Sequence, residues 1–519
     1  MRTIIALAAL AAAAPAHAQW SVANTQHFQI YSEQSPKALK GFAEELERYD
    51  QAVRLVRGMH DQPPSIGNRV TIFDVTPQTI SALARDPSGF IRGFYHADIA
   101  GSAAFVTRNT QMSFEKHTEQ LGPKIDQYEM RPDTVLLHEY AHHLMFQDLT
   151  TPYPQWLVEG FAEFMSGASF EKDGSVGLGL PAMHRYLGLA YDDQLSLESL
   201  FAGNFDKLTE EETESVYGQG WLLTHYLTFE PSRKGQLDAY VAAISRGVDP
   251  VVAAKQTFGD LDVLKHDLKS YFAHAQLKLS HLEIPGSDLK PVSVQISPVT
   301  AGGTAILPVL MQLNSGERED YKALAATAEG IEPRFAGDPL VETTLAQTEL
   351  EAKNFKAAQA AAERALAADP NSTSAMVLEG RAKIEQLAAA GGPAASFDEA
   401  RSWYLKANKL DPEDPEPLYR YYEAFAKQGV APSRNAIAAL HYASDLAPQD
   451  LGVRVESASV YLTEGKLKEA RTALVPVAFD PHGDKESATA REMIKDIDAG
   501  NAAAALAAAA AKPVQAKGS

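Results

Sequence analysis

The stretch that decides the fold of this chain is His138-Glu139-Tyr140-Ala141-His142, an H-E-x-x-H pattern. Residues four apart in an α-helix lie one turn apart on the same face, so both imidazoles can reach one metal ion. Neutral imidazole is a good ligand for Zn²⁺, and Glu139 is placed to take a proton from a water molecule. Apolar residues flank the motif at 135–137 and 144–146. The sequence therefore predicts a largely buried helix that carries a zinc site.

A second acidic segment follows, with 16 residues between His142 and Glu159. It runs Trp156-Leu157-Val158-Glu159-Gly160-Phe161-Ala162-Glu163-Phe164. Glu159 and Glu163 again stand four apart on one helical face. For Glu159, the alternative to a metal ligand is a carboxylate near a helix N-terminus, stabilised by the helix dipole. For Glu163, the alternative to a role beside the metal is a solvated position.

The two segments together resemble the gluzincin metallopeptidases, in particular the aminopeptidase-like branch in which H-E-x-x-H is followed by the Glu of a W-L-x-E-G-x-A segment. Within that branch the chain is most similar to the secreted peptidase-MA-like proteins. The resemblance implies one Zn²⁺ per chain, bound by His138, His142 and Glu159, with Glu139 as the general base. Glu163 matches no metal ligand of the family, but one turn beyond Glu159 it can accept the N–H of a ligand imidazole.

Peptide hydrolysis also needs a donor for the oxyanion that develops on the carbonyl group. Tyr217 is the candidate, because related proteins place a tyrosine at this point of the chain; a core tyrosine is the alternative. By analogy of order along the chain, residues 101–107 are expected to form the strand edge against which an extended substrate pairs. The gap between the motifs is slightly shorter than in aminopeptidases, and no G-x-M-E-N segment precedes them. Exopeptidase and endopeptidase action therefore both stay open.

Composition limits the classes of protein that this chain can represent. Its 519 residues are enough for about three folded units. A formal net charge of -20 disfavours binding to nucleic acid or to an anionic membrane. Cysteine is absent, so a metal site must use histidine and carboxylates.

Residues 1–18 combine a charged start, an apolar run and Ala16-His17-Ala18. This pattern predicts a cleaved signal peptide, and therefore a periplasmic or secreted protein without an integral membrane segment.

The part of the chain before the repeats is predicted to be an α+β metallopeptidase unit. Residues 19–120 combine short β-rich runs with one amphipathic helix, which predicts a small α/β layer. Residues 121–285 are predicted as the helical zinc-binding part, with helices around 134–146, 154–165 and 213–228 and a Gly-rich loop at 168–180. Residues 286–338 are expected to form a β-hairpin or linker, because 292–313 alternates in a strand-like way.

The C-terminal region repeats itself. Small residues recur at fixed offsets before Pro370, Pro412, Pro448 and Pro481, which are 42, 36 and 33 residues apart. These spacings bracket the roughly 34 residues of a tetratricopeptide repeat, and residues 339–482 resemble such repeats. The resemblance implies an all-α solenoid that binds substrate or a partner protein; a plain helical bundle is the alternative. Residues 483–519 are expected to form a helical or disordered tail without an assigned function.

These patterns together predict an exported zinc peptidase that acts on a peptide or protein substrate. The alternative from another class is an idle peptidase fold that serves as a scaffold or chaperone-like binding protein in the cell envelope. A metal-dependent hydrolase of other substrates is a third possibility. Four other histidines are not assigned to the metal site. His143 points about 100° away from its neighbour around the helix and is expected to be structural or exposed. His96, His184 and His225 are isolated and are expected to be structural.

Overall fold

The computed structural model describes residues 19–61, 64–88, 91, 93–107, 133–148, 153–185, 189, 195–203, 208–273, 280–316, 320–480 and 485–511. The predicted signal peptide, residues 1–18, lies outside this part of the chain. Within it, none of the helices has the length and apolar character required to cross a membrane.

A six-stranded sheet forms the base of the N-terminal unit, which we define as residues 19–298. Its strands, in spatial order, are β4 (Gly93–His96), β5 (Ala103–Val106), β3 (Val70–Asp74), β2 (Phe28–Ser32), β1 (Ser21–Asn24) and β9 (Gln295–Pro298). β2, β3 and β5 run parallel, whereas β4 is antiparallel to β5 and β1 is antiparallel to both β2 and β9. β4 and β5 form a hairpin with Phe94 opposite Phe105.

Side chains of alternating strand residues form two different cores. One face, with Ile30, Ile72 and Ala104, packs against α1 (Pro36–Arg57) and α3 (Thr134–Asp148). The other face, with Phe73 and Phe105, packs against α2 (Pro77–Leu83) and α11 (Ala301–Asn314). The sheet is thus covered on both sides, and α3 is held on the first face.

Two glycines allow α4 (Gln155–Ser166) and α7 (Glu210–Phe229) to pack backbone to backbone. A Cβ atom on Gly160 would lie 2.3 Å from the carbonyl oxygen of Gly220, and one on Gly220 would lie 2.6 Å from the carbonyl oxygen of Trp156. This close approach fixes α4 between α3 and α7. These are the helices predicted around 134–146, 154–165 and 213–228. The outer part of the unit consists of α6 (Leu197–Ala202), α8 (Gln236–Ser245), α9 (Pro250–Phe258) and α10 (Leu261–Ala273).

Two predictions for the connecting segments are wrong. The Gly-rich stretch at 168–180 contains a hairpin, β6 (Ala168–Phe170) and β7 (Val176–Leu178), which β8 (Leu282–Ile284) extends to three strands. The hairpin expected within 286–338 is absent from the described residues there: β9 pairs with β1, and α11 and α12 (Tyr321–Ile331) follow. Thr300 caps α11 by accepting a hydrogen bond from the backbone N–H of Gly303, which starts a helix where alternation indicated strands.

The C-terminal region is a TPR-like solenoid of consecutive helix pairs. It contains α13 (Pro339–Glu351), α14 (Phe355–Ala368), α15 (Thr373–Ala390), α16 (Ala394–Leu410), α17 (Pro415–Gln428), α18 (Arg434–Leu446), α19 (Leu451–Thr463) and α20 (Leu467–Ala478). Buried alanines such as Ala361 and Ala362 let neighbouring helices approach closely. α21 (Lys485–Asp498) and α22 (Ala502–Ala511) add a further pair, packed on α20 and α19. The described part of the predicted tail is therefore helical and continues the solenoid.

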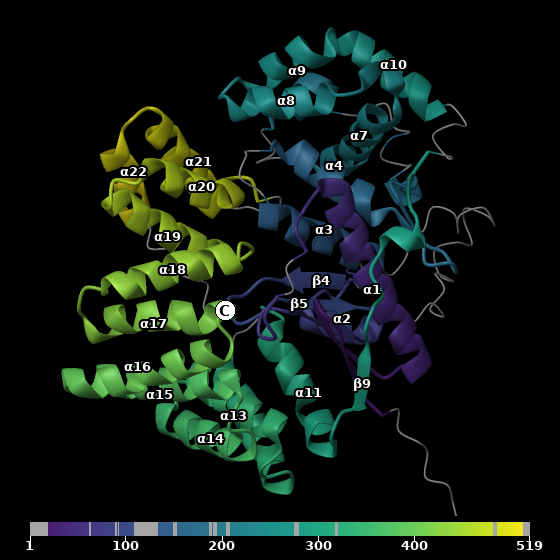
Figure 1. Cartoon of the computed structure of the whole chain (residues 1–519). Coiled ribbons are helices and arrows are strands. Elements are labelled where there is room, and N and C mark those ends of the chain that lie inside the picture. The colour runs from purple at the N-terminus through teal and green to yellow at the C-terminus, as the bar shows by residue number, and fades with distance from the viewer. Residues whose placement is uncertain are drawn as a thin grey trace, which may run out of the picture.

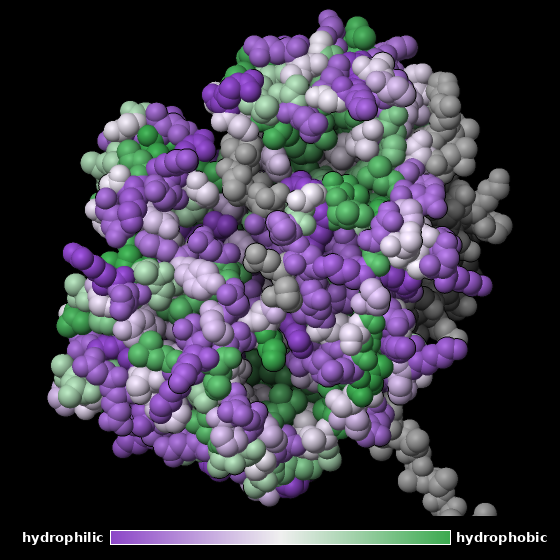
Figure 2. All heavy atoms as spheres, in the orientation of Figure 1, coloured by the Kyte–Doolittle hydropathy of each residue, from purple (hydrophilic) through white to green (hydrophobic). Residues whose placement is uncertain are grey.

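The solenoid curves along one side of the N-terminal unit, with α17 to α20 beside the strands and α3 (Figure 1). Figure 2 shows a mainly polar surface from the same side, with a hollow between the two parts and apolar side chains at its floor.

Candidate metal centre

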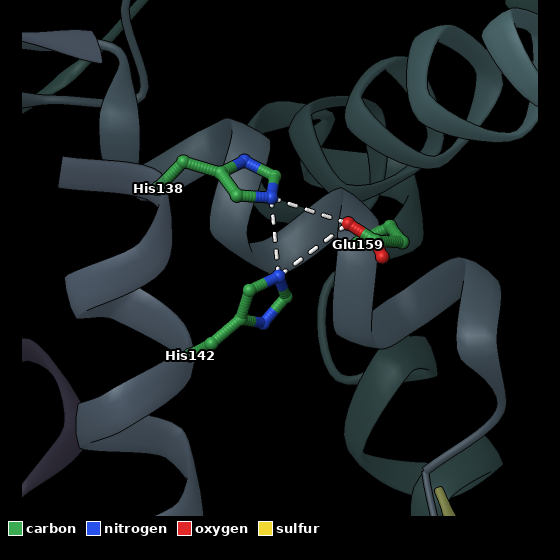
Figure 3. A group of neighbouring side chains, drawn as sticks. All are labelled: His138, His142 and Glu159. Atoms are coloured by element: carbon green, nitrogen blue, oxygen red, sulfur yellow. Dashed lines mark hydrogen bonds and ion pairs between the residues drawn. The ribbon is translucent and has the colours of Figure 1, made fainter. Parts of the chain in front are cut away.

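The three predicted ligands converge between α3 and α4. His138 and His142 project from one face of α3, and Glu159 projects toward them from α4 (Figure 3). The two imidazole Nε2 atoms lie 3.1 Å apart. Oε2 of Glu159 lies 3.2 Å from Nε2 of His138 and 3.4 Å from Nε2 of His142. The structure therefore brings together the residues that the sequence singles out as ligands.

This triangle has the dimensions of one face of a tetrahedral zinc site. Bonds of about 2.0–2.2 Å from zinc to nitrogen or oxygen place tetrahedral ligand atoms about 3.3–3.5 Å apart. Glu159 is only 1% exposed, and neither carboxylate oxygen makes a hydrogen bond within the described part of the chain. Burying a carboxylate in that state costs several kcal/mol, which a positive charge beside it offsets, either a proton on the imidazoles or a cation among the three ligand atoms. The donor set fits Zn²⁺.

Glu163 lies behind the imidazole of His138, on the side away from the other ligands. Its Oε1 is 3.3 Å from Nδ1 of His138, so it can hold the imidazole with Nε2 toward the metal position. Arg185 donates to the same carboxylate from Nη2 at 2.7 Å and from Nε at 3.1 Å. His184 contacts its other oxygen at 3.1 Å. Glu163 is buried, so the alternative of a solvated position is wrong.

Sequence reasoning missed Arg185 and treated His184 as isolated. Both belong to a short 3-10 helix, Met183–Arg185, which reaches Glu163 from more than twenty residues downstream. No fixed spacing connects this helix to the metal motif. A histidine and an arginine directly after a Gly-rich stretch were the available signal, and that pattern is not specific.

The charges of the centre favour a cation. Burial lowers the pKa of His138, but the carboxylates of Glu159 and Glu163 outweigh burial and raise it to about 10. Burial also opposes ionisation of Glu159, yet His138 and His142 hold its pKa well below the ordinary value. In the protein without metal, a proton on the imidazole supplies the positive charge that the carboxylates attract. A bound metal ion would take that role.

Tyr217 lies at the centre, in the first half of α7. Its ring centroid is 6.1 Å from that of His138, and the guanidinium of Arg185 lies over the Tyr217 ring at 4.5 Å. Burial and the nearby carboxylates, that of Glu159 foremost, raise the pKa of Tyr217, so the phenol stays protonated and can donate. Glu139 is half-buried on α3, and its charge also contributes to the raised pKa of Tyr217. Both predicted catalytic residues therefore lie near the ligands.

Two of the histidines not assigned to the metal site are buried away from the ligand atoms. Nδ1 of His143 is 2.9 Å from the Tyr95 hydroxyl, and the His143 ring stacks on Tyr140. Nδ1 of His225 is 2.8 Å from the Tyr271 hydroxyl.

The strand expected to pair with substrate is not an edge. β5, within residues 101–107, lies between β4 and β3 and is paired on both sides. The outermost strand on this side of the described sheet is β4, which packs on α3. The expectation was wrong by one strand, because order along the chain does not fix which strand of a hairpin lies outside.

Among the described residues, one other set of possible ligands comes together: His27, Asp50 and Asp61. Arg54 donates to both oxygens of Asp50 at 2.9 Å, and Lys290 pairs with Asp61. Protein cations thus already compensate these carboxylates, and we assign the set a structural role.

No protein-family model and no curated protein matches the chain. Solved structures similar to it include the thermophilic TPR protein TTC0263 of Thermus thermophilus, 18% identical, with a TM-score of 0.30 over 40% of this chain and 100% of that one. Yeast Tom70 is 13% identical, with a TM-score of 0.26 over 70% of this chain and 73% of its own.

Proposed function

We propose that the chain is an exported zinc peptidase of the gluzincin type, with the metal held by His138, His142 and Glu159. One observation carries the proposal: a buried carboxylate from α4 is aimed at two imidazole nitrogens from α3, at separations that fit a tetrahedral site. The order of the ligands, the Trp156 segment and Tyr217 also match the family pattern. A periplasmic or secreted location follows from the predicted signal peptide.

Each residue of the centre has a chemical task in this proposal. When bound, Zn²⁺ would polarise the scissile carbonyl and lower the pKa of a water molecule. Glu139 accepts the proton from that water and passes it to the leaving amine. Tyr217 donates a hydrogen bond to the oxygen of the attacked carbonyl. Glu163, held by Arg185, keeps the His138 imidazole turned toward the ligand position.

The outer edge of β4, which has no partner strand within the described part of the sheet, is the place for an extended substrate to pair. Backbone hydrogen bonds to an edge strand bind peptides without selecting side chains, which suits a peptidase of broad specificity. Identifying the cleaved bonds in a substrate of known sequence would distinguish exopeptidase from endopeptidase action.

Metal analysis and the Glu139→Gln variant test the proposal together. The purified full-length chain should contain about one zinc per chain, and should cleave labelled casein, used as an unfolded substrate, after zinc is restored to the chelated protein. Glu139→Gln should keep the metal and lose at least about 100-fold in rate, because it removes only the general base. Glu171→Gln, on an exposed residue of the β6–β7 turn, is the matched control. Absence of zinc, or unchanged cleavage by Glu139→Gln, would refute the proposal.

The second candidate function is a scaffold or chaperone-like binding protein, and the TPR-like solenoid favours it. Such solenoids offer extended concave surfaces for protein partners. A scaffold should suppress aggregation of an unfolded client equally well with and without Glu139→Gln. If the chain binds zinc and hydrolyses esters but not casein, the third possibility, a hydrolase of other substrates, replaces the first.

A further inference from the structure

The turn between β4 and β5 is inserted into the solenoid of the same chain. Ile99, in this turn, is only 4% exposed and belongs to an apolar cluster whose other buried members are solenoid residues. They are Leu440 and Ala443 of α18, Ala447 after it, and Val453 of α19. Side chains of α17 pack on the same cluster. A side chain of the N-terminal unit thus fills the space among three consecutive solenoid helices.

Polar contacts around Ile99 fit the same arrangement. The backbone N–H of Ile99 donates a hydrogen bond to the carboxylate of Asp450, at the start of α19. The charge of Asp98 acts on the buried guanidinium of Arg420 in α17. The first contact satisfies a backbone group that would otherwise lose its water partner on burial. The second places unlike charges near each other.

A second loop of the N-terminal unit, just before β3, docks beside the first. Asn68 donates from Nδ2 to the carbonyl oxygen of Leu446 at 2.7 Å. Gly67 lies directly against Asp414, since a Cβ atom on this glycine would come 2.8 Å from the Asp414 Cγ atom. β3 and β5 run parallel, so the loops preceding them emerge at one end of the sheet and meet the solenoid together.

A third contact joins the solenoid to the metal-bearing helices. Phe146, one turn beyond His142 on α3, is buried in the cluster formed by α19 to α22, and Tyr153, just before α4, packs against it. The strand β4 packs on α3, which carries two of the predicted ligands, and both elements end against the solenoid. A solenoid that served only to bind other proteins would not need these contacts with the N-terminal unit of its own chain.

We propose that the helical repeats act in cis. Their inner surface between α17 and α19 takes the chain's own β4–β5 turn as its ligand, and this docking fixes the edge strand β4 relative to the metal centre. This inference rests on the proposed function for its catalytic consequence, but not for the docking itself. A partner protein would have to bind elsewhere on the solenoid or displace Ile99.

Engineered disulfides test the docking, because the chain has no cysteine. The Gly67→Cys and Asp414→Cys pair should cross-link, since a Cβ on residue 67 lies within 2.8 Å of the Asp414 Cγ atom and disulfides need Cβ atoms about 3.5–4.5 Å apart. Gly67→Cys with Val430→Cys is the control: Val430 follows the far end of α17, about 20 Å along the helix, and should not cross-link. Absence of the first cross-link in the oxidised full-length chain overturns the docking.

Two variants test whether docking supports catalysis by fixing β4. One is the same double variant, Gly67→Cys with Asp414→Cys, and the other is Ile99→Asp. The oxidised, cross-linked double variant should cleave labelled casein at the rate of its reduced form, because locking preserves the active arrangement. Ile99→Asp should keep its zinc, lose at least tenfold in cleavage, and exchange the β4 amide hydrogens faster. Loss of cleavage on locking, or an Ile99→Asp variant with unchanged exchange and cleavage, overturns the cis role. Failure of the peptidase proposal is distinguishable, because cross-linking of the double variant and β4 exchange do not depend on activity.

Discussion

The Glu159→Gln substitution removes one negative charge from the candidate metal centre and keeps the shape of the side chain. The three ligand atoms are 3.1, 3.2 and 3.4 Å apart, and zinc bound by such atoms needs separations of about 3.3–3.5 Å. Binding therefore requires shifts of only a few tenths of an ångström. Because little free energy goes into rearranging the site, zinc should bind the folded chain tightly and thereby stabilise it against unfolding.

The expected stabilisation follows from mass action. At a free zinc concentration 100 times the dissociation constant, the folded state gains about 2.7 kcal/mol. For a folded unit about as large as the N-terminal unit, each kcal/mol of added unfolding free energy raises Tm by roughly 2–4 °C. Zinc should therefore raise Tm by roughly 5–11 °C. A variant that binds 100-fold more weakly gains about 0.4 kcal/mol at the same zinc concentration, or roughly 1 °C.

Differential scanning calorimetry of chelated, full-length protein measures both shifts. Glu139→Gln should show the full shift, because Glu139 holds no metal, and magnesium should give none. An equal zinc shift in wild type and Glu159→Gln would show that the α4 carboxylate is not a ligand. A wild-type chain without any shift would remove zinc from the centre altogether.

Three further predictions concern the surroundings of the centre. Arg185→Lys loses the two-pronged contact with Glu163 and the stacking on Tyr217, so zinc affinity should fall about tenfold by calorimetric titration; Glu214→Gln, which removes only the outer partner of Arg185, should not change it. Burial lowers the pKa of His225 to about 4, so the unfolded state binds the extra proton between about pH 6.5 and 4. Unfolding free energy should therefore fall by up to about 3 kcal/mol as pH drops through that range, a loss that His225→Gln should abolish in urea titrations. Gly160→Ala would place a Cβ 2.3 Å from a backbone oxygen of α7 and should cost at least about 2 kcal/mol; Gly41→Ala, on α1 with no atom within 4 Å of the added Cβ, should be neutral or slightly stabilising.

The two helices that carry the candidate ligands could be predicted from sequence because their signals are local. His138, His142, the flanking apolar residues and the second acidic segment all lie within residues 135–164. Helix geometry then places the side chains without any knowledge of the rest of the fold. The ends of α3 and α4 fall within two residues of the predicted bounds.

Features that depend on packing between distant segments could not be predicted. Gly302 and Gly303 have the character of turn residues, yet they lie in the first turn of α11. Added Cβ atoms there would come 2.8 Å from the Asp338 carboxylate and 2.7 Å from Val299, so packing requires small residues. Ile99 gives no signal either, because a single apolar residue in a turn has no periodicity. Its partners are more than 300 residues away in the sequence.

The burial of Glu159 separates the peptidase from an idle scaffold. A scaffold needs the solenoid and a stable N-terminal unit, and neither needs a carboxylate at 1% exposure without a hydrogen bond in the described chain. Replacing a whole buried ion pair or triad with apolar residues is often neutral or stabilising, whereas removing one partner alone is destabilising. A protein that only binds partners would thus gain from losing His138, His142 and Glu159 together, whereas a metal enzyme needs all three. If the triple variant His138→Leu, His142→Leu and Glu159→Leu makes the zinc-free chain more stable and abolishes the zinc shift, the cost of this buried group is explained by metal binding. If the zinc-free chain is instead destabilised, the three residues serve the fold, and the scaffold becomes the better account.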